Sequence, residues 1–167
     1  MTEERSGVAD KQAIAELLYL YCRAMDRMDI PLGYSIWHED GEADYGESLY
    51  RGSGRGFVDF AAASHTPMLA HSHQVTTIII NLDGDQAASE SYVTAVLRFT
   101  EDGRLKNITA QGRYLDRWSY RNGRWAIDKR VYIHDLDEVR EVQPAGIVSR
   151  GARDRSTPSY AILAAPT

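Results

Sequence analysis

The sequence predicts an α+β fold in which N-terminal helices pack against one curved antiparallel sheet. Apolar residues recur at helical spacing in the first third of the chain only, and from Ala70 onward the period changes to two. The chain has 167 residues, of which 43% are hydrophobic, which fits one globular domain. Helices followed by a run of hairpins predict a cone-shaped roll, with the sheet wrapped around the helices and enclosing a pocket.

The first helix is predicted from about Asp10, a suitable N-cap, to Met28. Its apolar residues form one stripe, made of Ile14, Leu17, Leu18, Tyr21, Met25 and Met28. Asp26 falls on the edge of this stripe. Periodicity therefore leaves open whether its carboxylate is a buried partner or a half-exposed surface group.

A short second helix is predicted after Asp29, which has the residue type of an N-cap and is followed by Pro31 in the first turn. An extended piece at residues 42–45 separates it from a third helix that ends before Pro67. The glycine-rich residues 52–56 follow no strand, which argues against a dinucleotide-binding loop. We interpret them as a loop leading into the third helix.

The remainder of the domain is predicted to be a four-stranded antiparallel meander joined by short turns. Turn signals lie at Asp83-Gly84, at residues 101–103 and at Asn122-Gly123. The strands between and beside them are expected at about 70–82, 87–99, 105–120 and 125–133. Counting back from Asn122-Gly123 places Arg117 opposite Asp128 and Asp116 opposite Lys129, as cross-strand charge pairs on a solvated face.

Residues 1–136 are expected to form the cone domain and residues 137–167 a C-terminal arm. The last stretch contains prolines and glycines, but also apolar residues such as Ile147, Tyr160 and Leu163. Apolar clusters are uncommon in disordered ends. An arm that packs on the domain or on a neighbouring subunit is therefore weighed equally against a flexible tail.

Composition excludes several classes of partner. Nineteen basic residues against twenty-four acidic ones give a net charge of −5, so no global positive field attracts nucleic acid or an anionic membrane. The single cysteine, Cys22, permits no intramolecular disulfide, and the N-terminus has no apolar signal core. No apolar run approaches the roughly 20 residues that span a bilayer. A cytoplasmic protein without nucleic-acid or membrane partners is expected.

Two histidines begin the first long strand and carry the main chemical signal. Strand alternation puts His71 and His73 on one face, about 6.5 to 7 Å apart along the chain. The same alternation predicts that Val75, Thr77 and Ile79 share that face. The pair is interpreted in three ways: as histidines satisfied by backbone or water, as metal ligands, or as the location of a general base.

A metal site is the weakest of these interpretations. It requires a third ligand, and the candidates Asp26, His38 and His134 follow no recognised metal-ligand spacing. A general base needs only a carboxylate that accepts the proton of one imidazole nitrogen and so fixes the tautomer. Asp26 is the candidate for that carboxylate, and the resulting chemistry needs no cofactor.

Several motifs together resemble the SnoaL-like branch of the nuclear-transport-factor-two-like superfamily, over about residues 10–135. They are Tyr21-Cys-Arg-Ala-Met-Asp26, Trp37-His-Glu-Asp40, Asp44-Tyr45, the His71/His73 strand, Gly112-Arg-Tyr-Leu-Asp-Arg-Trp118 and Arg124-Trp125. The resemblance implies the cone fold, assembled as a homodimer or homotrimer. It constrains function less, because this superfamily includes dehydratases, isomerases, cyclases, a dehydrochlorinase, dioxygenase small subunits and binding modules.

Within that resemblance, an Asp-His dyad falls on Asp26 and His73, and a tyrosine five residues before the aspartate falls on Tyr21. These three are the candidate catalytic residues. Tyr21 also lies at the centre of the apolar stripe, so core packing is its alternative interpretation. The candidate substrate-binding residues are Tyr45, His71, Ser91, Tyr114 and Arg130.

Two of these assignments depart from the family pattern. Ser91 stands approximately where some dehydratase members have a second catalytic histidine. Arg130 aligns with a pocket arginine, but the register counted from Asn122-Gly123 places it on the face opposite Tyr114. Either a β-bulge intervenes or the assignment of Arg130 is wrong.

The function predicted from the sequence is a cofactor-independent lyase of the dehydratase type, or an isomerase, acting on a small apolar cyclic substrate. His73 would abstract a proton from carbon, and Asp26 would orient and charge-stabilise the imidazolium. Tyr21, with Tyr45 or His71, would stabilise the leaving group. The alternative is a non-catalytic binding protein or assembly subunit with the same fold.

Overall fold

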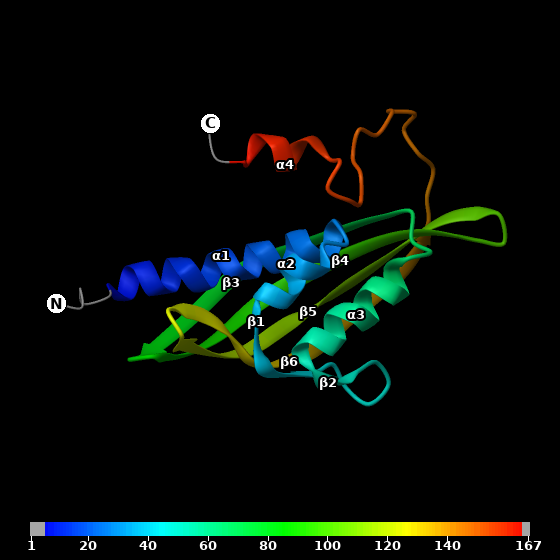
Figure 1. Cartoon of the computed structure of the whole chain (residues 1–167). Helices are drawn as coiled ribbons and strands as arrows, with labels where there is room; N and C mark the ends of the chain where they lie inside the picture. The colour runs from blue at the N-terminus through cyan, green and yellow to red at the C-terminus, as the bar shows by residue number, and fades with distance from the viewer. Residues whose placement is uncertain (1–5, 165–167) are drawn as a thin grey trace.

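Three helices precede the long strands, and a fourth lies near the C-terminus (Figure 1). The computed structural model describes residues 6–164. The helices are α1 (Gly7–Asp26), α2 (Ile30–Ser35), α3 (Gly54–His65) and α4 (Pro158–Ile162). The strands are β1 (Trp37–Asp44), β2 (Arg51–Ser53), β3 (Ala70–Asp83), β4 (Gln86–Glu101), β5 (Arg104–Arg121) and β6 (Arg124–Glu141).

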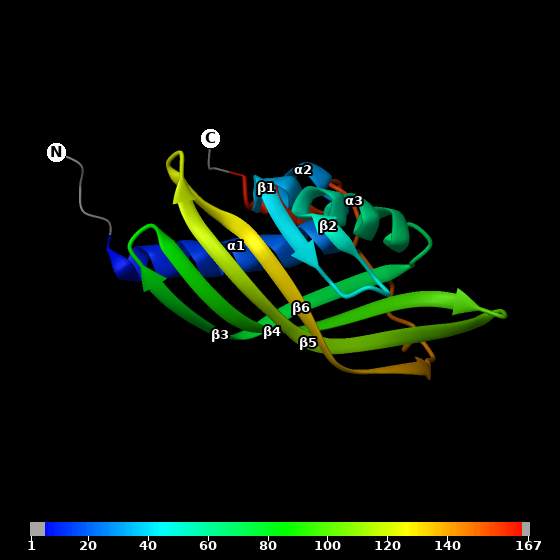
Figure 2. The ribbon, with the colours of Figure 1, turned by 90° about the horizontal axis from the view of Figure 1, so that it is seen from below.

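The strands form one six-stranded sheet in the order β2-β1-β6-β5-β4-β3. All neighbours are antiparallel except β1 and β6, which run parallel. Figure 2 shows the curved sheet, with α1 and α3 packed against one of its faces. The predicted α+β cone, with helices first and a meander afterwards, is confirmed.

The helix ends differ slightly from the prediction. The helix α1 begins at Gly7, and Asp10 lies in its first turn, where its buried carboxylate accepts a hydrogen bond from Trp125 Nε1 at 2.7 Å. Asp29 caps α2 as predicted, because its Oδ1 accepts from the backbone N–H of Leu32. The interpretation of residues 52–56 as a loop that follows no strand is wrong, because Arg51–Ser53 form β2 and α3 begins directly at Gly54. A Cβ atom at Gly54 would lie 2.0 Å from the Trp37 ring. Only glycine fits there.

Two of the three predicted turns are confirmed in place. Asp102-Gly103 and Asn122-Gly123 both have positive φ at the two central residues, which matches the right-handed twist of the flanking strands. The first turn is displaced by one residue from the prediction. Because Asp83 still pairs with Gln86, the loop is Gly84-Asp85. The glycine then occupies the first central position, at φ +57°.

A β-bulge interrupts β3 at Thr77. Thr76 pairs with Tyr92 and Ile79 pairs with Glu90, so two residues of β3 oppose one residue of β4. Thr77 takes a φ of +50°, and the alternation reverses after it. The prediction that Thr77 and Ile79 share the face of His73 is therefore wrong. Ile79 is 54% exposed, whereas Ile78 packs against the core.

A second bulge, in β6, decides the orientation of Arg130. Trp118 pairs with Ile127 but Arg117 pairs with Lys129, so Asp128 is the extra residue. The prediction that Arg117 lies opposite Asp128 is therefore wrong, and so is the prediction that Asp116 lies opposite Lys129. The bulge shifts the register by one, which turns Arg130 to the inner face of the sheet, where it pairs with Asp116.

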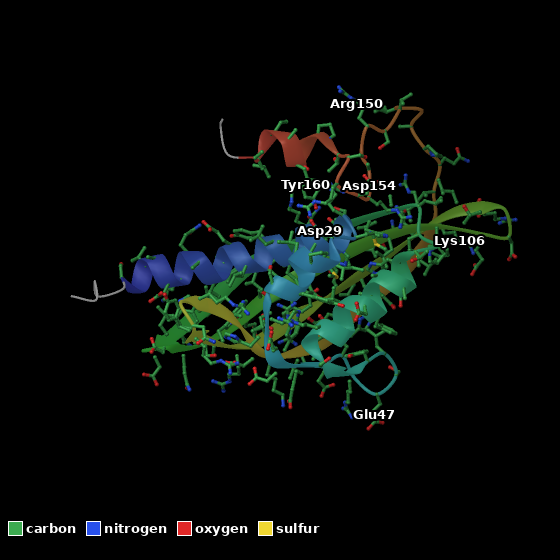
Figure 3. The ribbon with its side chains drawn as sticks, in the orientation of Figure 1. Asp29, Glu47, Lys106, Arg150, Asp154 and Tyr160 are labelled. Atoms are coloured by element: carbon green, nitrogen blue, oxygen red, sulfur yellow. The ribbon has the colours of Figure 1, made fainter. Side chains whose placement is uncertain are left out.

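The chain after β6 returns to the helices. Strand β6 continues to Glu141, across the predicted boundary at residue 136, and α4 then lies beside α1 (Figure 1). Tyr160 of α4 and Asp29 at the α1–α2 junction face each other in Figure 3, and the Tyr160 hydroxyl donates to Asp29 Oδ2 at 2.7 Å. The division at residue 136 remains a prediction. No helix within residues 6–164 has the length and apolar composition needed to cross a membrane.

Candidate active site

The end of α1 and the beginning of β3 bring Asp26 and His73 together. His73 Nδ1 lies 2.7 Å from Asp26 Oδ1, and the backbone N–H of His73 donates to both carboxylate oxygens at 3.0 Å. The carboxylate is thus held by one side chain and one backbone group of the same residue. The side chain of His73 is 8% exposed and that of Asp26 is 15% exposed. Helical periodicity left the orientation of Asp26 open, and packing of α1 against β3 decides it.

This contact assigns the tautomer of neutral His73. An ionised carboxylate only accepts hydrogen bonds, so Nδ1 carries the proton and donates it to Asp26. Nε2 is then left with a lone pair, and it has no hydrogen-bond partner among residues 6–164. An imidazole oriented by a carboxylate, with the opposite nitrogen unoccupied, has the arrangement of a general base.

The dyad lines a groove of about 440 Å³ between α1 and the edge strand β3. Ser159 of the C-terminal arm closes one side of it. The lining residues are Tyr19, Cys22, Arg23, Asp26, Arg27, His73, Gln74, Val75 and Ser159. The volume is within the range of small-molecule sites. The groove is therefore the candidate place for a small ligand to bind beside the dyad.

Two further histidines surround the dyad. The ring of His65, the last residue of α3, lies 4.6 Å from the ring of His71 and 5.8 Å from that of His73. Burial, together with the nearby imidazoles, lowers the pKa of His65 to about 4. Burial and the charge of Arg153 also lower the pKa of His71. Both rings are kept neutral at pH 7 beside His73.

Arg153, from the C-terminal arm, fixes the tautomer of His71. Its guanidinium lies 3.2 Å from His71 Nε2 and also donates to the backbone carbonyls of His65 and Thr66. Because a guanidinium only donates hydrogen bonds, Nε2 of His71 accepts and Nδ1 carries the proton. This one side chain links the arm, the end of α3 and the beginning of β3.

The predicted tyrosines and Arg130 form a second, closed cluster. The hydroxyls of Tyr21 and Tyr45 are 2.9 Å apart. The guanidinium of Arg130 lies 4.3 Å from the ring centre of Tyr21 and 3.9 Å from that of Tyr114. It also makes a two-pronged ion pair with Asp116, at 2.7 and 2.8 Å. Burial raises the pKa of each of the three tyrosines above the ordinary range, so their hydroxyls stay protonated.

Access separates this cluster from the dyad. The groove is lined by Asp26 and His73 but by none of Tyr21, Tyr45, Tyr114, Arg130 and Ser91. Three of these five, Tyr21, Arg130 and Ser91, are 1% exposed or less. The hydroxyl of Ser91 is buried without a hydrogen-bond partner in the described part of the chain. A substrate would reach these side chains only if the surrounding core moved. Their assignment as catalytic or substrate-binding residues remains a prediction.

Sequence reasoning did not single out His65, Arg153 or Asp116 for the site. His65 lies at the end of a predicted helix and Arg153 in the arm, so only the fold brings them to His71. Asp116 was placed opposite Lys129, one residue from its true partner. Among residues 6–164, no group of three or more His, Cys, Asp or Glu side chains is arranged to hold a metal ion.

Comparison with known proteins agrees with the geometry of the fold. Residues 6–131 match the SnoaL-like domain family. Similar structures include a proposed scytalone dehydratase from Novosphingobium aromaticivorans, with a TM-score of 0.70, 21% identity and coverage of 85% of this chain and 97% of that one. A hexachlorocyclohexane dehydrochlorinase (LinA Type2) has a TM-score of 0.73, 20% identity and coverage of 84% and 97%.

The beta subunit of a proposed aromatic-ring-hydroxylating dioxygenase from Novosphingobium aromaticivorans is also similar. It has a TM-score of 0.62, 16% identity and coverage of 77% of this chain and 91% of that one. No curated protein sequence matches the chain. At these identities the similarity shows a shared fold, and the chemistry has to be argued from the residues of this chain.

Proposed function

The chain belongs to the SnoaL-like domain family, and from that premise we propose that it is a cofactor-independent lyase of the dehydratase type, or an isomerase, that uses Asp26 and His73. The observation that carries the proposal is the contact of 2.7 Å between His73 Nδ1 and Asp26 Oδ1 beside an open groove. The dehydratase and dehydrochlorinase folds to which this one is similar support the same class of reaction.

In the proposed mechanism, His73 Nε2 takes a proton from a carbon of the substrate. The C–H bond breaks, an N–H bond forms, and Asp26 stabilises the resulting imidazolium through Nδ1–H. In a dehydration, the electron pair of the C–H bond forms the double bond while the C–O bond of the leaving hydroxyl breaks. The imidazolium then gives its proton to that oxygen, which leaves as water. In an isomerisation, the same proton returns to a different carbon.

In this scheme His73 carries out both proton transfers. The pKa values of His65 and His71 are lowered, so both rings are neutral and neither has an imidazolium proton to give to the leaving group. The scheme does not require Tyr21, whose hydroxyl is bonded to Tyr45 inside the core. The role predicted for Tyr21 as a stabiliser of the leaving group would need the core to open toward the groove. Activity of Tyr21→Phe distinguishes the two schemes, since only the second loses turnover.

The test begins with a thermal-shift screen of cyclic alcohols, steroids and halogenated rings, followed by turnover assays on the compounds that bind. His73→Ala should abolish turnover while leaving the far-UV circular dichroism and unfolding cooperativity intact. His134→Ala, an exposed histidine outside the groove, is the matched control and should retain full activity. Full activity of His73→Ala would rule out this mechanism.

The alternative is a non-catalytic binding protein or assembly subunit, which the similarity to a dioxygenase beta subunit supports. Under this alternative, compounds found by the screen would bind but undergo no turnover, and His73→Ala would change neither result.

We further propose that the chain forms homodimers or homotrimers. Leu136 and Val139, on the extended end of β6, and Tyr92 on β4 are apolar and 44% to 55% exposed. Native mass spectrometry measures the assembly directly.

A further inference from the structure

The mouth of the dyad groove carries two arginines from the C-terminal end of α1. Arg23 lies in the last turn of α1 and Arg27 is the residue that directly follows the helix, and both line the groove together with His73. Both side chains are half-buried. Two like charges this close in the chain repel each other. The C-terminal end of the α1 dipole offsets part of this repulsion, and a bound anion would offset more of it.

No carboxylate in the described chain compensates them. Arg51, Arg113 and Arg121 each lie within 3.0 Å of an aspartate, but neither Arg23 nor Arg27 has an acidic partner within 4.0 Å among residues 6–164. The Arg27 guanidinium donates only to the backbone carbonyl of Asp26, at 3.4 Å. The two arginines are therefore half-buried cations without a counter-ion within salt-bridge distance, on a protein that has a net charge of −5.

The one carboxylate that lines the groove is already engaged. Asp26 accepts hydrogen bonds from the ring and from the backbone of His73. These bonds leave the negative charge of Asp26 in place, so the two arginines and this one carboxylate give the groove lining a formal charge of 2 − 1 = +1. The groove is therefore locally positive within an acidic molecule.

Arg23 is also held in place for binding. Its guanidinium lies over the ring of Tyr160, 4.2 Å from the ring centre, and the Tyr160 hydroxyl is anchored by Asp29. Stacking occupies the face of a guanidinium and leaves the N–H groups along its edge free to donate. No acceptor for them is present in the described residues. The C-terminal arm thus orients a fork of donors at the mouth of the groove.

We propose that the substrate of this site carries a carboxylate, which Arg23 and Arg27 bind while a C–H bond of the same molecule faces His73 Nε2. This inference rests on the proposed function for the C–H chemistry, and it narrows the substrate from an apolar ring to an apolar ring that bears an acid. Carboxylates match the fork geometry of guanidinium groups, and bonds between the two charged partners are stronger than neutral ones. The remaining lining, including Val75 and the Tyr19 ring, suits the apolar part.

The experiment compares cyclohexanecarboxylate with cyclohexanecarboxamide, which has nearly the same shape without the charge. Binding to the full chain is measured by calorimetry and by the chemical shift of the His73 ring. The acid should bind at least tenfold more tightly than the amide, and its affinity should fall as salt rises. Arg23→Gln/Arg27→Gln should remove that preference and leave binding of the amide unchanged. Arg117→Gln/Arg150→Gln, at two exposed arginines outside the groove, is the matched control.

Equal affinity for acid and amide in the wild-type chain, or an unchanged preference in Arg23→Gln/Arg27→Gln, would overturn the proposal. The arginines would then act only as charges that stabilise the C-terminal end of α1. Should the double variant not fold, Arg27→Gln alone is used, because Arg27 contacts only one backbone carbonyl. His73→Ala should retain acid binding, so loss of the proposed catalysis and loss of the proposed acid site give different results.

Discussion

Two carboxylates of this domain are each paired with a nitrogen-containing side chain, but the surroundings of the two pairs differ. Asp26 with His73 and Asp116 with Arg130 have the same closest separation of 2.7 Å. The first pair lines a groove, whereas both side chains of the second are 0% exposed and are enclosed by tyrosine rings. The comparison shows that two features distinguish a candidate reactive pair from a structural one. The first is access through the groove, and the second is a nitrogen with a lone pair, which neutral imidazole has and guanidinium lacks.

The comparison predicts the largest effect on activity at Asp26. Asp26→Asn replaces a carboxylate that only accepts with an amide whose NH2 can donate to Nδ1, which favours the wrong His73 tautomer, and it removes the charge that stabilises the imidazolium. We expect turnover of a substrate found by the screen to fall about 10²- to 10⁴-fold, by the logic of catalytic triads. Steady-state kinetics gives the size of the loss, and ¹⁵N-resolved spectra of His73 report the tautomer. Unchanged kinetics would place the chemistry elsewhere.

The largest effect on stability is expected at the closed pair. Arg130→Met leaves the Asp116 carboxylate buried without a partner, which should lower the free energy of unfolding by about 3 to 5 kcal/mol. Urea denaturation measures it. The exposed pair of Arg121 and Asp40 provides the control, because solvent screens it and Arg121→Met should therefore cost far less. Equal losses for the two variants would contradict the distinction drawn between them.

A smaller effect is expected where the arm meets the histidines. Arg153→Met removes the donor to His71 Nε2 and the cation that, after burial, does most to lower the pKa of that ring. The pKa of His71 should therefore rise, and stability should fall by about 1 kcal/mol from the lost hydrogen bonds. An NMR titration of the ring reports the first, and Arg150→Met is the control in the same arm. If the pKa of His71 is the same in Arg153→Met as in the wild-type chain, Arg153 has no electrostatic effect on this ring.

An effect of similar size is expected from His65 when the pH is lowered. Its pKa is lowered to about 4 from the ordinary 6.5, so between these values the unfolded chain binds the proton and the folded chain does not. The free energy of unfolding therefore falls as pH decreases from about 6.5 to 4. For this partly exposed group the loss is on the order of 1 kcal/mol. His65→Gln should flatten that part of the stability curve, and a curve of unchanged slope would show that His65 does not titrate as described.

Much of the fold could be predicted because its signals are local. Helical spacing around Leu18, alternation along β3 and positive-φ residue types at Asn122-Gly123 each depend on a few neighbours in the sequence. The errors were also local in origin. The bulges at Thr77 and Asp128 have no sequence signal of their own. The first shifts the rest of β3 to the other face, and the second shifts β6 as far as the next irregularity, at Asp135.

The candidate site could be predicted only in part, and unevenly. Asp26 and His73 were paired through chemical type and family resemblance, and they are in contact. Tyr21 and Arg130 were assigned to a pocket on the same grounds, but they lie in the core, because neither residue type nor motif shows whether space remains beside a side chain. His65 and Arg153 join the dyad from distant parts of the chain.

By itself, the sequence determined the fold class, the order of the elements and the residue types available for proton transfer, since periodicity and turn chemistry act over short distances. The tertiary structure decided which of these residues meet and which of them solvent can reach. It places Asp26 against His73 in an open groove and Asp116 against Arg130 in a closed core. Both outcomes depend on strand register and on the packing of α1 and the arm, which are properties of the whole chain.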